Sequence, residues 1–429
     1  MRSDICTRSA GVQLPGMPRP AERLARSLLL AALKRLRDGR LDIEVDGQLL
    51  RFGACTGRCG LRASIRVHDA TFWSALAYGG STGAGSSYIA GAWEADDLVR
   101  VIRILARNRQ VLAGMDGIGA RLIGLARRAA HVLRRNSRAG ARTNIQAHYD
   151  IGNELFRRML DDNMLYSSGI FPHPDASLDV AQEHKCRLAC ERLRLHPGQH
   201  LLEIGTGWGG MALLAARDYG CRVTSATISQ EQYELARERV RAAGLADRIE
   251  VVLSDYRDLQ GVYDHIVTIE MIEAVGHQYY RTFFREAQRL LAPGGAMLMQ
   301  AITIEDQRFD RARNHVDFIK HYVFPGSCIP SVTALCQAAT ADSDLRLHEL
   351  HDQTAHYART LHLWRERCRE QRQDLAGLGY DERFQRMWDF YLAYCEGGFA
   401  ERSISCGQLL WVRPDWRSRG HHLLGYAGD

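Results

Sequence analysis

A run of glycines beside one acidic residue is the part of the sequence best suited to hold a cofactor. Residues 201–212 read LLEIGTGWGGMA, an apolar stretch that leads into glycines and then into a helical pattern. Glycine allows backbone conformations closed to other residues, and the start of a helix presents free N–H groups to a ligand. The segment therefore predicts a strand, a turn and a helix around a nucleotide-like cofactor.

Two classes of cofactor fit this loop. Gly205, Gly207 and Gly210 match the GxGxxG pattern of dinucleotide sites. With Glu203 and Gly209, the loop also matches the acid-x-GxGxG pattern of S-adenosylmethionine (SAM) methyltransferases. A dinucleotide site needs an acid about 20 residues later to hold the ribose, and the second predicted strand, CRVTSATIS, contains none. SAM is the favoured cofactor, because Glu203 suits a cationic ligand or a ribose.

The bulk properties indicate a globular protein. The chain has 429 residues, 46% hydrophobic and 25% charged, with a net charge of +6, and this length allows two or three domains. The apolar run LLLAAL is too short to cross a bilayer, and no cleavage-like segment follows it. Eleven cysteines lack zinc-site spacing, which indicates free thiols in a reducing cytoplasm and no metal site.

The patterning predicts three parts. We expect a loose tail at 1–20, an N-terminal lipid- or membrane-associated domain at 21–140 and a catalytic domain at 141–429. Residues 21–38 have the spacing of a basic amphipathic helix, and 41–68 alternate like strands. A helix packed on a small core is favoured over one lying on a membrane.

A second basic segment, 118–142, contains seven arginines and no acid. Such a segment is attracted to polyanions, and each basic residue near an anionic bilayer contributes about 1 kcal/mol. Its amphipathic character favours a bilayer over a nucleic acid. An exposed linker helix is the alternative.

From about residue 144, apolar strands alternate with helices, which predicts an α/β fold with a doubly wound, mostly parallel sheet. Ligands in such sheets bind beyond the carboxyl ends of the strands. After residue 305 the pattern is helical and aromatic, which indicates either a cover over an apolar tunnel or a plain core. The expected strands are HLLEIG, RVTSAT, IEVVLS, YDHIVTIE and GAMLMQAIT.

With these motifs in place, the chain resembles the cyclopropane-fatty-acid synthase and mycolic-acid methyltransferase family over roughly residues 60–415. The resemblance implies a class I SAM methyltransferase fold, Rossmann-like, with a small N-terminal α+β domain and a helical lipid-tunnel cover. The N-terminal stretches VHDATFW and GSSYIAGAWEADDL resemble the longer, phospholipid-acting members. The other motifs are HYDIGNELFRRMLDDNMLYSSGIF, LLEIGTGWGG, ATISQEQ, SDYRDL, IEMIEAVG, FIKHYVFPG, HYARTLHLW and MWDFYLAYCEGGF.

The activity that this resemblance implies is transfer of the SAM methyl group to a cis double bond in a phospholipid acyl chain, giving a cyclopropane through a carbocation. Aromatic side chains would stabilise that cation in a site that excludes water. The implied partners are membrane phospholipids and a membrane surface, with the protein cytoplasmic and peripheral to the inner membrane. No nucleic acid is expected, and a homodimer stays an open option.

The resemblance also implies which residues contact SAM. Thr227 and Gln232, neutral hydrogen-bonding residues, would take the place of the missing acid, and Asp255 and Tyr256 would lie at the adenine. The full implied set is Tyr166, Ser167, Glu203, Gly205, Gly207, Gly209, Thr227, Gln232, Asp255, Tyr256 and Ile269.

The base implied by the family is a bicarbonate ion held by a Cys, a Glu, a His, an Ile backbone and a Tyr. This chain matches Glu273, Ile302 and Tyr357 but has Ser168 in place of the Cys and Gln300 in place of the His. Glutamine carries no charge, so bicarbonate would be held less firmly, or Glu273 itself would accept the proton. A methylene- or methyl-branched product is therefore the alternative to the cyclopropane.

Several of these residues also have purely structural explanations. Glu273 could cap a helix, and Tyr357 and Gln300 could form hydrogen bonds in a core. Cys395 matches a cysteine of the family's C-terminal motif, but an apolar helical setting favours packing over catalysis.

The sequence disfavours two other classes of function. A nucleic-acid methyltransferase would show an Asn/Asp-Pro-Pro-aromatic motif after the fourth strand, where this chain reads IEMIEAVG. A lipid-binding protein with a decayed SAM fold is disfavoured by the intact glycine loop and Glu273.

Overall fold

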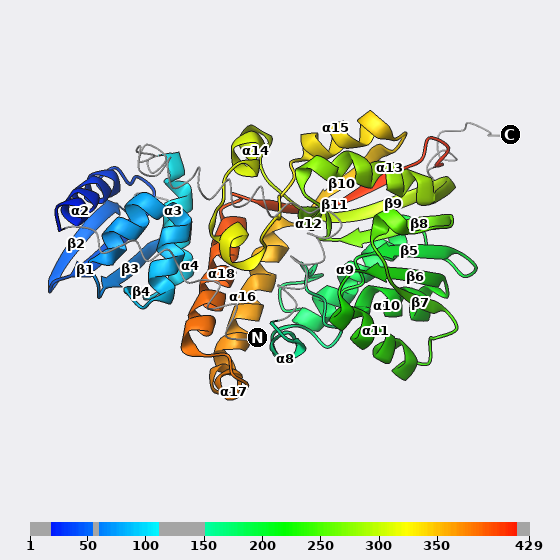
Figure 1. Cartoon of the computed structure of the whole chain (residues 1–429), viewed down its shortest axis with the longest axis horizontal. Helices are drawn as coiled ribbons and strands as arrows, with labels where there is room; N and C mark the ends of the chain where they lie inside the picture. The colour runs from blue at the N-terminus through cyan, green and yellow to red at the C-terminus, as the bar shows by residue number, and fades with distance from the viewer. Residues whose placement is uncertain (1–18, 55–59, 111–150, 418–429) are drawn as a thin grey trace. The chain divides into compact units, whose positions relative to one another are not determined.

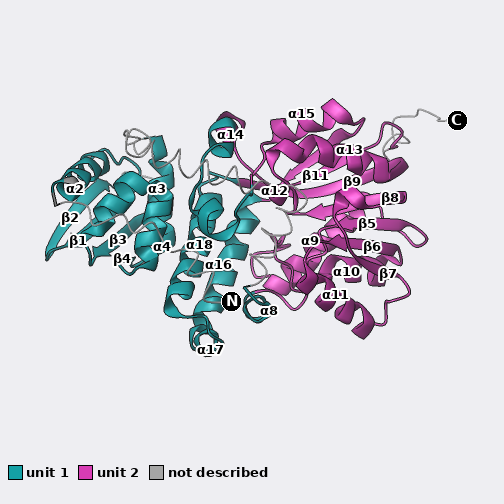
Figure 2. Ribbon diagram, in the orientation of Figure 1, with its two compact units in different colours: residues 1–159, 310–327, 354–404 teal, residues 160–309, 328–353, 405–429 magenta. Residues whose placement is uncertain are grey.

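A computed structural model describes residues 19–54, 60–110 and 151–417, which form two compact units (Figures 1 and 2). The expected tail lies almost entirely outside the described residues, and the boundary near residue 140 and the arginine-rich segment 118–142 lie wholly outside them. Unit 1 comprises residues 1–159, 310–327 and 354–404, and unit 2 comprises residues 160–309, 328–353 and 405–429.

Unit 2 is built on a seven-stranded sheet in the order β10-β11-β9-β8-β5-β6-β7 (Figure 1). Strands β5 to β9 are parallel, and β11 runs antiparallel between β9 and β10. The five expected strands and the doubly wound α/β fold are confirmed. The strands are β5 (His200–Ile204), β6 (Arg222–Thr227), β7 (Ile249–Leu253), β8 (Tyr263–Ile269), β9 (Leu291–Thr303), β10 (Arg346–Asp352) and β11 (Ser405–Val412).

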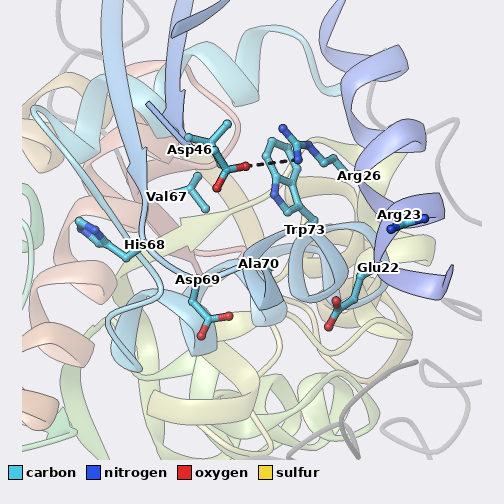
Figure 3. A pocket seen from close by; sticks show the side chains of 10 residues that line it. Glu22, Arg23, Arg26, Asp46, Val67, His68, Asp69, Ala70 and Trp73 are labelled. Atoms are coloured by element: carbon cyan, nitrogen blue, oxygen red, sulfur yellow. Dashed lines mark ion pairs between the residues drawn. The ribbon is translucent and has the colours of Figure 1, made fainter. Parts of the chain in front are cut away.

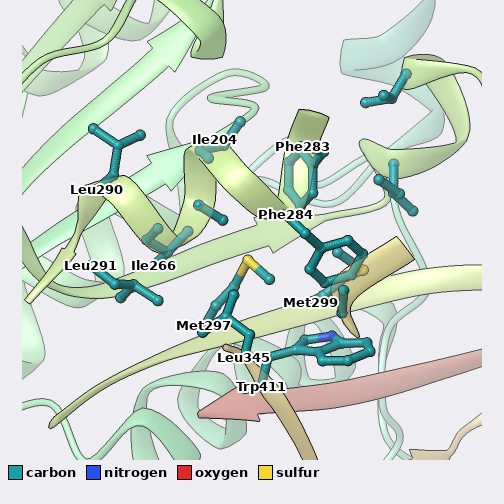
Figure 4. Close-up of a cluster of buried hydrophobic side chains, with 14 of the residues drawn as sticks. Ile204, Ile266, Phe283, Phe284, Leu290, Leu291, Met297, Met299, Leu345 and Trp411 are labelled. Atoms are coloured by element: carbon teal, nitrogen blue, oxygen red, sulfur yellow. The ribbon is translucent and has the colours of Figure 1, made fainter. Parts of the chain in front are cut away.

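Helices cover both faces of this sheet. Side chains alternate along a strand, so Leu201 belongs to one core layer and Leu202 to the other. One layer packs against α9 (Leu178–Leu193), α10 (Gly210–Tyr219) and α11 (Gln230–Ala242). The other packs against α13 (Tyr280–Leu290) and α15 (Val332–Asp342), and Figure 4 shows its Phe284, Met297 and Trp411 side chains together. The short helices are η1 (Tyr256–Asp258), α12 (Ile272–Val275) and η2 (His277–Tyr279).

Strands β10 and β11 correct the expectation of a purely helical region after residue 305. Strand β11 reads SCGQLLWV and is buried on both faces, so it lacks the apolar-polar alternation that marks a strand in sequence. Strand β10 reads RLHELHD, an edge strand too polar to be recognised by its hydrophobic pattern.

The first part of unit 1 is a small α+β arrangement. Its sheet has the order β2-β1-β3-β4, and β1 and β2 form a hairpin through Asp46 and Gly47, both with positive φ as a tight hairpin turn requires. The predicted amphipathic helix is confirmed, with Ala25 and Leu29 buried. The elements are α2 (Arg19–Leu33), β1 (Gly39–Val45), β2 (Gln48–Ala54), β3 (Arg62–Val67), α3 (Thr71–Ile89), β4 (Trp93–Ala95) and α4 (Leu98–Arg107).

Helix α18 joins this arrangement to the later helices of unit 1, because it packs against α3, α4 and α16. Two glycines allow the close approach: a Cβ at Gly85 of α3 would lie 3.1 Å from Phe390 of α18, and one at Gly397 of α18 would lie 2.6 Å from Ile102 of α4. In the described residues, no helix is long and apolar enough to cross a membrane. The later elements are α8 (Asn153–Met159), α14 (Asp306–Arg313, shared between the units), η3 (Ile319–Val323), α16 (Thr354–Glu370), α17 (Arg372–Gly377) and α18 (Glu382–Ala400).

Candidate functional site

The glycine loop links β5 to α10 in unit 2. Gly205, Gly207 and Gly209 have positive φ angles of 101°, 52° and 86°, a region that side-chain-bearing residues rarely adopt. At Gly207 an added Cβ would meet no atom within 4 Å, so this part of the loop borders open space. At Gly210 a Cβ would lie 2.7 Å from the Asn163 carbonyl oxygen, so that glycine serves packing. The loop thus has the backbone shape and the free space that a SAM site needs.

Glu203 is buried directly beneath this loop. The hydroxyl of Ser225 on β6 donates a hydrogen bond to its carboxylate and also lies 2.8 Å from the Thr206 hydroxyl oxygen. Burial raises the pKa of Glu203 to about 8, although the Ser225 hydrogen bond and the positive charge of Lys185 oppose that shift. Glu203 is therefore fixed in place and responsive to a positive charge brought close to it.

Lys185 and Gln182 on α9 hold the segment that contains the expected SAM contacts Tyr166 and Ser167. The fully buried Lys185 ammonium donates to the Ser167 hydroxyl at 2.7 Å and to Gln182 Oε1 at 2.7 Å. The Gln182 amide donates to the carbonyl oxygens of Leu165 and Ser167. Neither α9 residue was expected from the sequence, and the available signal was that lysine occurs only three times in the chain.

Thr227, the last residue of β6, forms a hydrogen bond with Gln232. These are the two neutral residues expected in place of the ribose-binding acid. The Thr227 hydroxyl donates to Gln232 Oε1 at 2.8 Å, and both side chains are buried. The Gln232 side-chain NH₂ group has no partner among the described residues. It remains available to a ribose hydroxyl.

Asp255 and Tyr256 follow β7. Arg257 binds both oxygens of the buried Asp255 carboxylate, at 2.8 and 2.6 Å, and a carboxylate so bound keeps lone pairs for a ligand. The Tyr256 ring lies 5.4 Å from the Phe283 ring, and burial raises the pKa of its hydroxyl. The last residue of β8, Ile269, is half-buried.

Glu270, directly after β8, is a site residue that the sequence did not reveal. It has a positive φ of 50°, which is uncommon for a residue with a side chain and is often found at functional sites. One of its carboxylate oxygens accepts the backbone N–H of Ser168 at 2.9 Å and the side-chain amide of Gln300 at 2.8 Å. Ser168 and Gln300 are thus brought together, but around a carboxylate.

All the hydrogen-bonding groups of the buried Gln300 amide face protein groups. Its nitrogen donates to the Ser168 carbonyl oxygen at 3.2 Å as well as to Glu270, and its oxygen accepts from Gln408 at 3.1 Å. The Ser168 hydroxyl donates to the Gly169 carbonyl oxygen. The expected bicarbonate does not fit these residues, because their donors are engaged and Glu270 adds a negative charge that repels an anion.

Glu273 on α12 is the second carboxylate of this region. Its Oε1 accepts the backbone N–H of Ile302 on β9 at 2.5 Å, so the side chain contacts a strand as well as lying at the start of its own helix. Its Oε2 is buried and has no hydrogen-bond partner in the described chain. Burial, and secondarily the negative charge of Glu270, raise the pKa of Glu273 to about 8. An unpartnered carboxylate oxygen with such a pKa is suited to accept a proton.

The other two expected catalytic residues, Tyr357 and Cys395, belong to unit 1. The Tyr357 ring is buried and stacks on Phe399 with ring centroids 4.2 Å apart. Burial, together with the negative charge of Asp317, raises the pKa of the Cys395 thiol. That side chain stays protonated, which favours a packing role.

The chain is similar to known proteins over most of its length. The family model described as mycolic acid cyclopropane synthetase matches residues 136–409. Tuberculostearic acid methyltransferase UfaA1 of Mycobacterium tuberculosis is 38% identical over 374 residues, which is 84% of this chain and 86% of that protein. Cyclopropane-fatty-acyl-phospholipid synthase of Escherichia coli is 36% identical over 358 residues, covering 82% of this chain and 88% of that protein.

Solved structures of cyclopropane synthases are also similar to this chain. The cyclopropane synthase MmaA2 from Mycobacterium tuberculosis superposes with a TM-score of 0.59 at 28% identity, covering 63% of this chain and 98% of that chain. Mycolic acid cyclopropane synthase CmaA1 complexed with SAH and CTAB also gives a TM-score of 0.59, at 30% identity and the same coverage.

Proposed function

Because this chain belongs to the mycolic acid cyclopropane synthetase family, we propose that it transfers a methyl group from SAM to the cis double bond of an unsaturated phospholipid acyl chain. The enzyme class of the family is SAM-dependent methyl transfer. One observation carries the proposal. The buried Glu273 carboxylate, with one oxygen unpartnered among the described residues, lies in the same unit as the open glycine loop, and the strands that precede them, β8 and β5, are hydrogen-bonded neighbours.

The loop side of the site holds the donor. When bound, SAM supplies an electrophilic methyl group on a positively charged sulfur. The backbone at Gly207 leaves room for the ligand, and the Gln232 amide is available to its ribose. Burial raises the pKa of Glu203, below the loop, to about 8, and the positive charge of SAM would favour its ionised form. An alkene is a weak nucleophile, so holding the two reactants in line provides much of the rate acceleration.

The Glu273 side of the site removes the proton. Addition of the methyl group to the double bond leaves a carbocation on the acyl chain, and loss of one proton completes the reaction with a net gain of CH₂. At neutral pH, a pKa of about 8 keeps Glu273 largely protonated in the free protein. Positive charge arriving beside it lowers this pKa and favours the ionised form, so Glu273 loses its proton, and becomes able to accept one, as the substrates bind.

Two products are compatible with this chemistry. We favour the methylene-branched chain, which a separate reductase would convert to a methyl branch, because Glu270, Ser168 and Gln300 occupy the position where the family's anion would be held. The relative with 38% identity is named as a methyltransferase. The cyclopropane, favoured by the sequence, becomes the second candidate. It is supported by the hydrogen bond between Glu273 and Ile302, which brings together two residues that match the family's site, and by the similarity to the Escherichia coli synthase.

Such a substrate lies in a bilayer, so the protein would act at a membrane surface, which we place at the cytoplasmic face of the inner membrane. The test uses purified protein, SAM with a deuterated methyl group, and vesicles of phospholipids with cis-unsaturated chains. Mass spectrometry of the released fatty acids is expected to show a gain of CD₂. Mild hydrogenation then separates the products, because a methylene branch takes up hydrogen and a ring does not. Absence of label in the acyl chains, from protein that binds SAM, would contradict the proposal.

A further inference from the structure

The surroundings of an arginine decide what it can hold in place. A pocket of about 260 Å³ beside α2 is lined by Arg26 and Asp46, whose side chains form an ion pair at 3.5 Å (Figure 3). These side chains are 37% and 75% exposed, and exposed pairs of this kind contribute little. Arg192, in the last turn of α9, differs because its guanidinium contacts the first of two buried amides in unit 2.

The two amides belong to Gln300 and Gln408, which lie opposite each other on β9 and β11. They are paired in the register of the two strands, and each residue is 0% exposed. Residues two apart on a strand face the same side, so both side chains point into the core layer that contains Leu298 and Leu410 and packs against α9. A buried amide needs hydrogen-bond partners, because an unpaired polar group in a core is costly.

The acceptors beside Gln300 fix the direction in which its amide points. Its NH₂ group donates to the carbonyl oxygen of Ser168 at 3.2 Å and to the carboxylate of Glu270 at 2.8 Å. A carbonyl oxygen and an ionised carboxylate can only accept hydrogen bonds. The amide oxygen of Gln300 must therefore face the other way, toward β11.

Arg192 fixes the second amide from the opposite end. Its guanidinium donates to Gln408 Oε1. A guanidinium has five N–H donors and no acceptor, so the NH₂ group of Gln408 is left to donate to Gln300 Oε1, at 3.1 Å. Burial lowers the pKa of Arg192, but a guanidinium stays charged at neutral pH. The two ends of the chain thus require the same orientation of both amides.

We propose that Arg192 and Gln408 are positioning residues for the methyl-transfer site, which hold the Gln300 amide with its NH₂ group toward Glu270. A hydrogen bond to the ionised form of a carboxylate favours that form, so the chain of amides keeps Glu270 negative. This charge is one cause of the raised pKa of Glu273. The effect on catalysis rests on the proposed function, whereas the orientation of the amides does not.

Other titratable groups around Glu270 come from three elements. The Cys406 thiol of β11 donates to the same Glu270 oxygen at 3.8 Å, and burial raises the pKa of this thiol, so it stays protonated. Lys185 of α9 and Glu273 of α12 are the other charged groups that act on this thiol. A substitution at Arg192 leaves all of them in place, so its effect on Glu270 must pass through the amides or act directly through the lost charge.

The first experiment follows the side-chain NH₂ protons of Gln300 by NMR in the full-length protein without SAM. Their signals are assigned through their loss in Gln300→Met. Arg192→Met should speed their exchange with solvent about fivefold, the equivalent of one hydrogen bond, and Arg192→Lys, which keeps a charged donor, should restore slow exchange. Arg187→Met is the matched control, because Arg187 lies on the same helix and pairs with Glu183 and Asp218 instead. It should change the exchange rate less than twofold.

The second experiment measures the pH profile of kcat/KM. Arg192→Met and Gln408→Met should each move the profile to lower pH, in the direction expected for Glu270→Gln but by less, and Arg187→Met should not move it. In the Glu270→Gln background neither should add a shift, because the charge through which they act is gone. A shift for Arg192→Met without one for Gln408→Met would show a direct charge effect and overturn the proposal.

Unchanged amide exchange in Arg192→Met would overturn it as well. Faster exchange in a protein that transfers no methyl group would support the positioning role and count against the proposed function.

Discussion

Glu203 on β5 and Glu273 on α12 offer a comparison within unit 2. Each carboxylate is buried, and burial raises the pKa of each to about 8. They differ in their surroundings. Glu203 is bound by Ser225 and lies in the field of a buried lysine, whereas Glu273 has an oxygen with no partner among the described residues and a second carboxylate nearby. In the function we propose, the same displaced pKa belongs to a fixed group that helps to bind SAM in one place and to a proton acceptor in the other.

The largest effect that separates the two glutamates should come from Glu273→Gln. Glutamine keeps the acceptor for the Ile302 N–H but cannot take a proton. Turnover should fall by about 10²- to 10⁴-fold, the usual loss when a general base is removed. SAM affinity, measured by calorimetry, should stay the same. Full turnover in this variant would remove Glu273 from the chemistry.

Glu203→Gln should act on the other step. Glutamine cannot ionise when the positive charge of SAM arrives above it, so SAM binding should weaken by about tenfold, which corresponds to about 1.4 kcal/mol. The turnover number at saturating SAM should change by less than about threefold. If this variant instead loses turnover with unchanged SAM affinity, the two carboxylates do not have the separate roles assigned here.

The smallest expected effect is on the pH dependence of kcat/KM, which should reflect the pKa of Glu273. A base with a pKa of about 8 must lose its proton to act, so kcat/KM should fall by about tenfold per pH unit below that value. Glu270→Gln removes a negative charge that raises the Glu273 pKa, so the profile should move to lower pH. Burial, the larger cause, remains, and the shift should be partial. A shift to higher pH would contradict the assigned cause.

Much of unit 2 could be predicted because its signals are local. Five strands and the glycine loop follow from runs of adjacent residues, and so do the strands expected within residues 41–68 of unit 1. Strands β10 and β11 could not be predicted, because one is polar along an edge and the other is buried on both faces. Neither pattern distinguishes a strand from its neighbours.

Site residues could be predicted where a local sequence motif marks them. They could not be predicted where their role depends on contact with a residue far along the chain. Glu273 was expected, but the role of Glu270 depends on a positive φ angle and on contacts with Ser168 and Gln300, which lie 102 and 30 residues away in sequence. Lys185 reaches Ser167 only through the packing of α9. A single sequence does not show which distant residues come into contact.

The central claim is that a protein carboxylate, Glu273, accepts the proton without help from bicarbonate. Turnover in buffer stripped of carbon dioxide, followed by addition of bicarbonate, tests it most directly. We predict equal rates before and after the addition. Loss of activity on stripping, with recovery when bicarbonate is restored, would show that an anion occupies the place we assign to Glu270 and its partners, and would contradict the account.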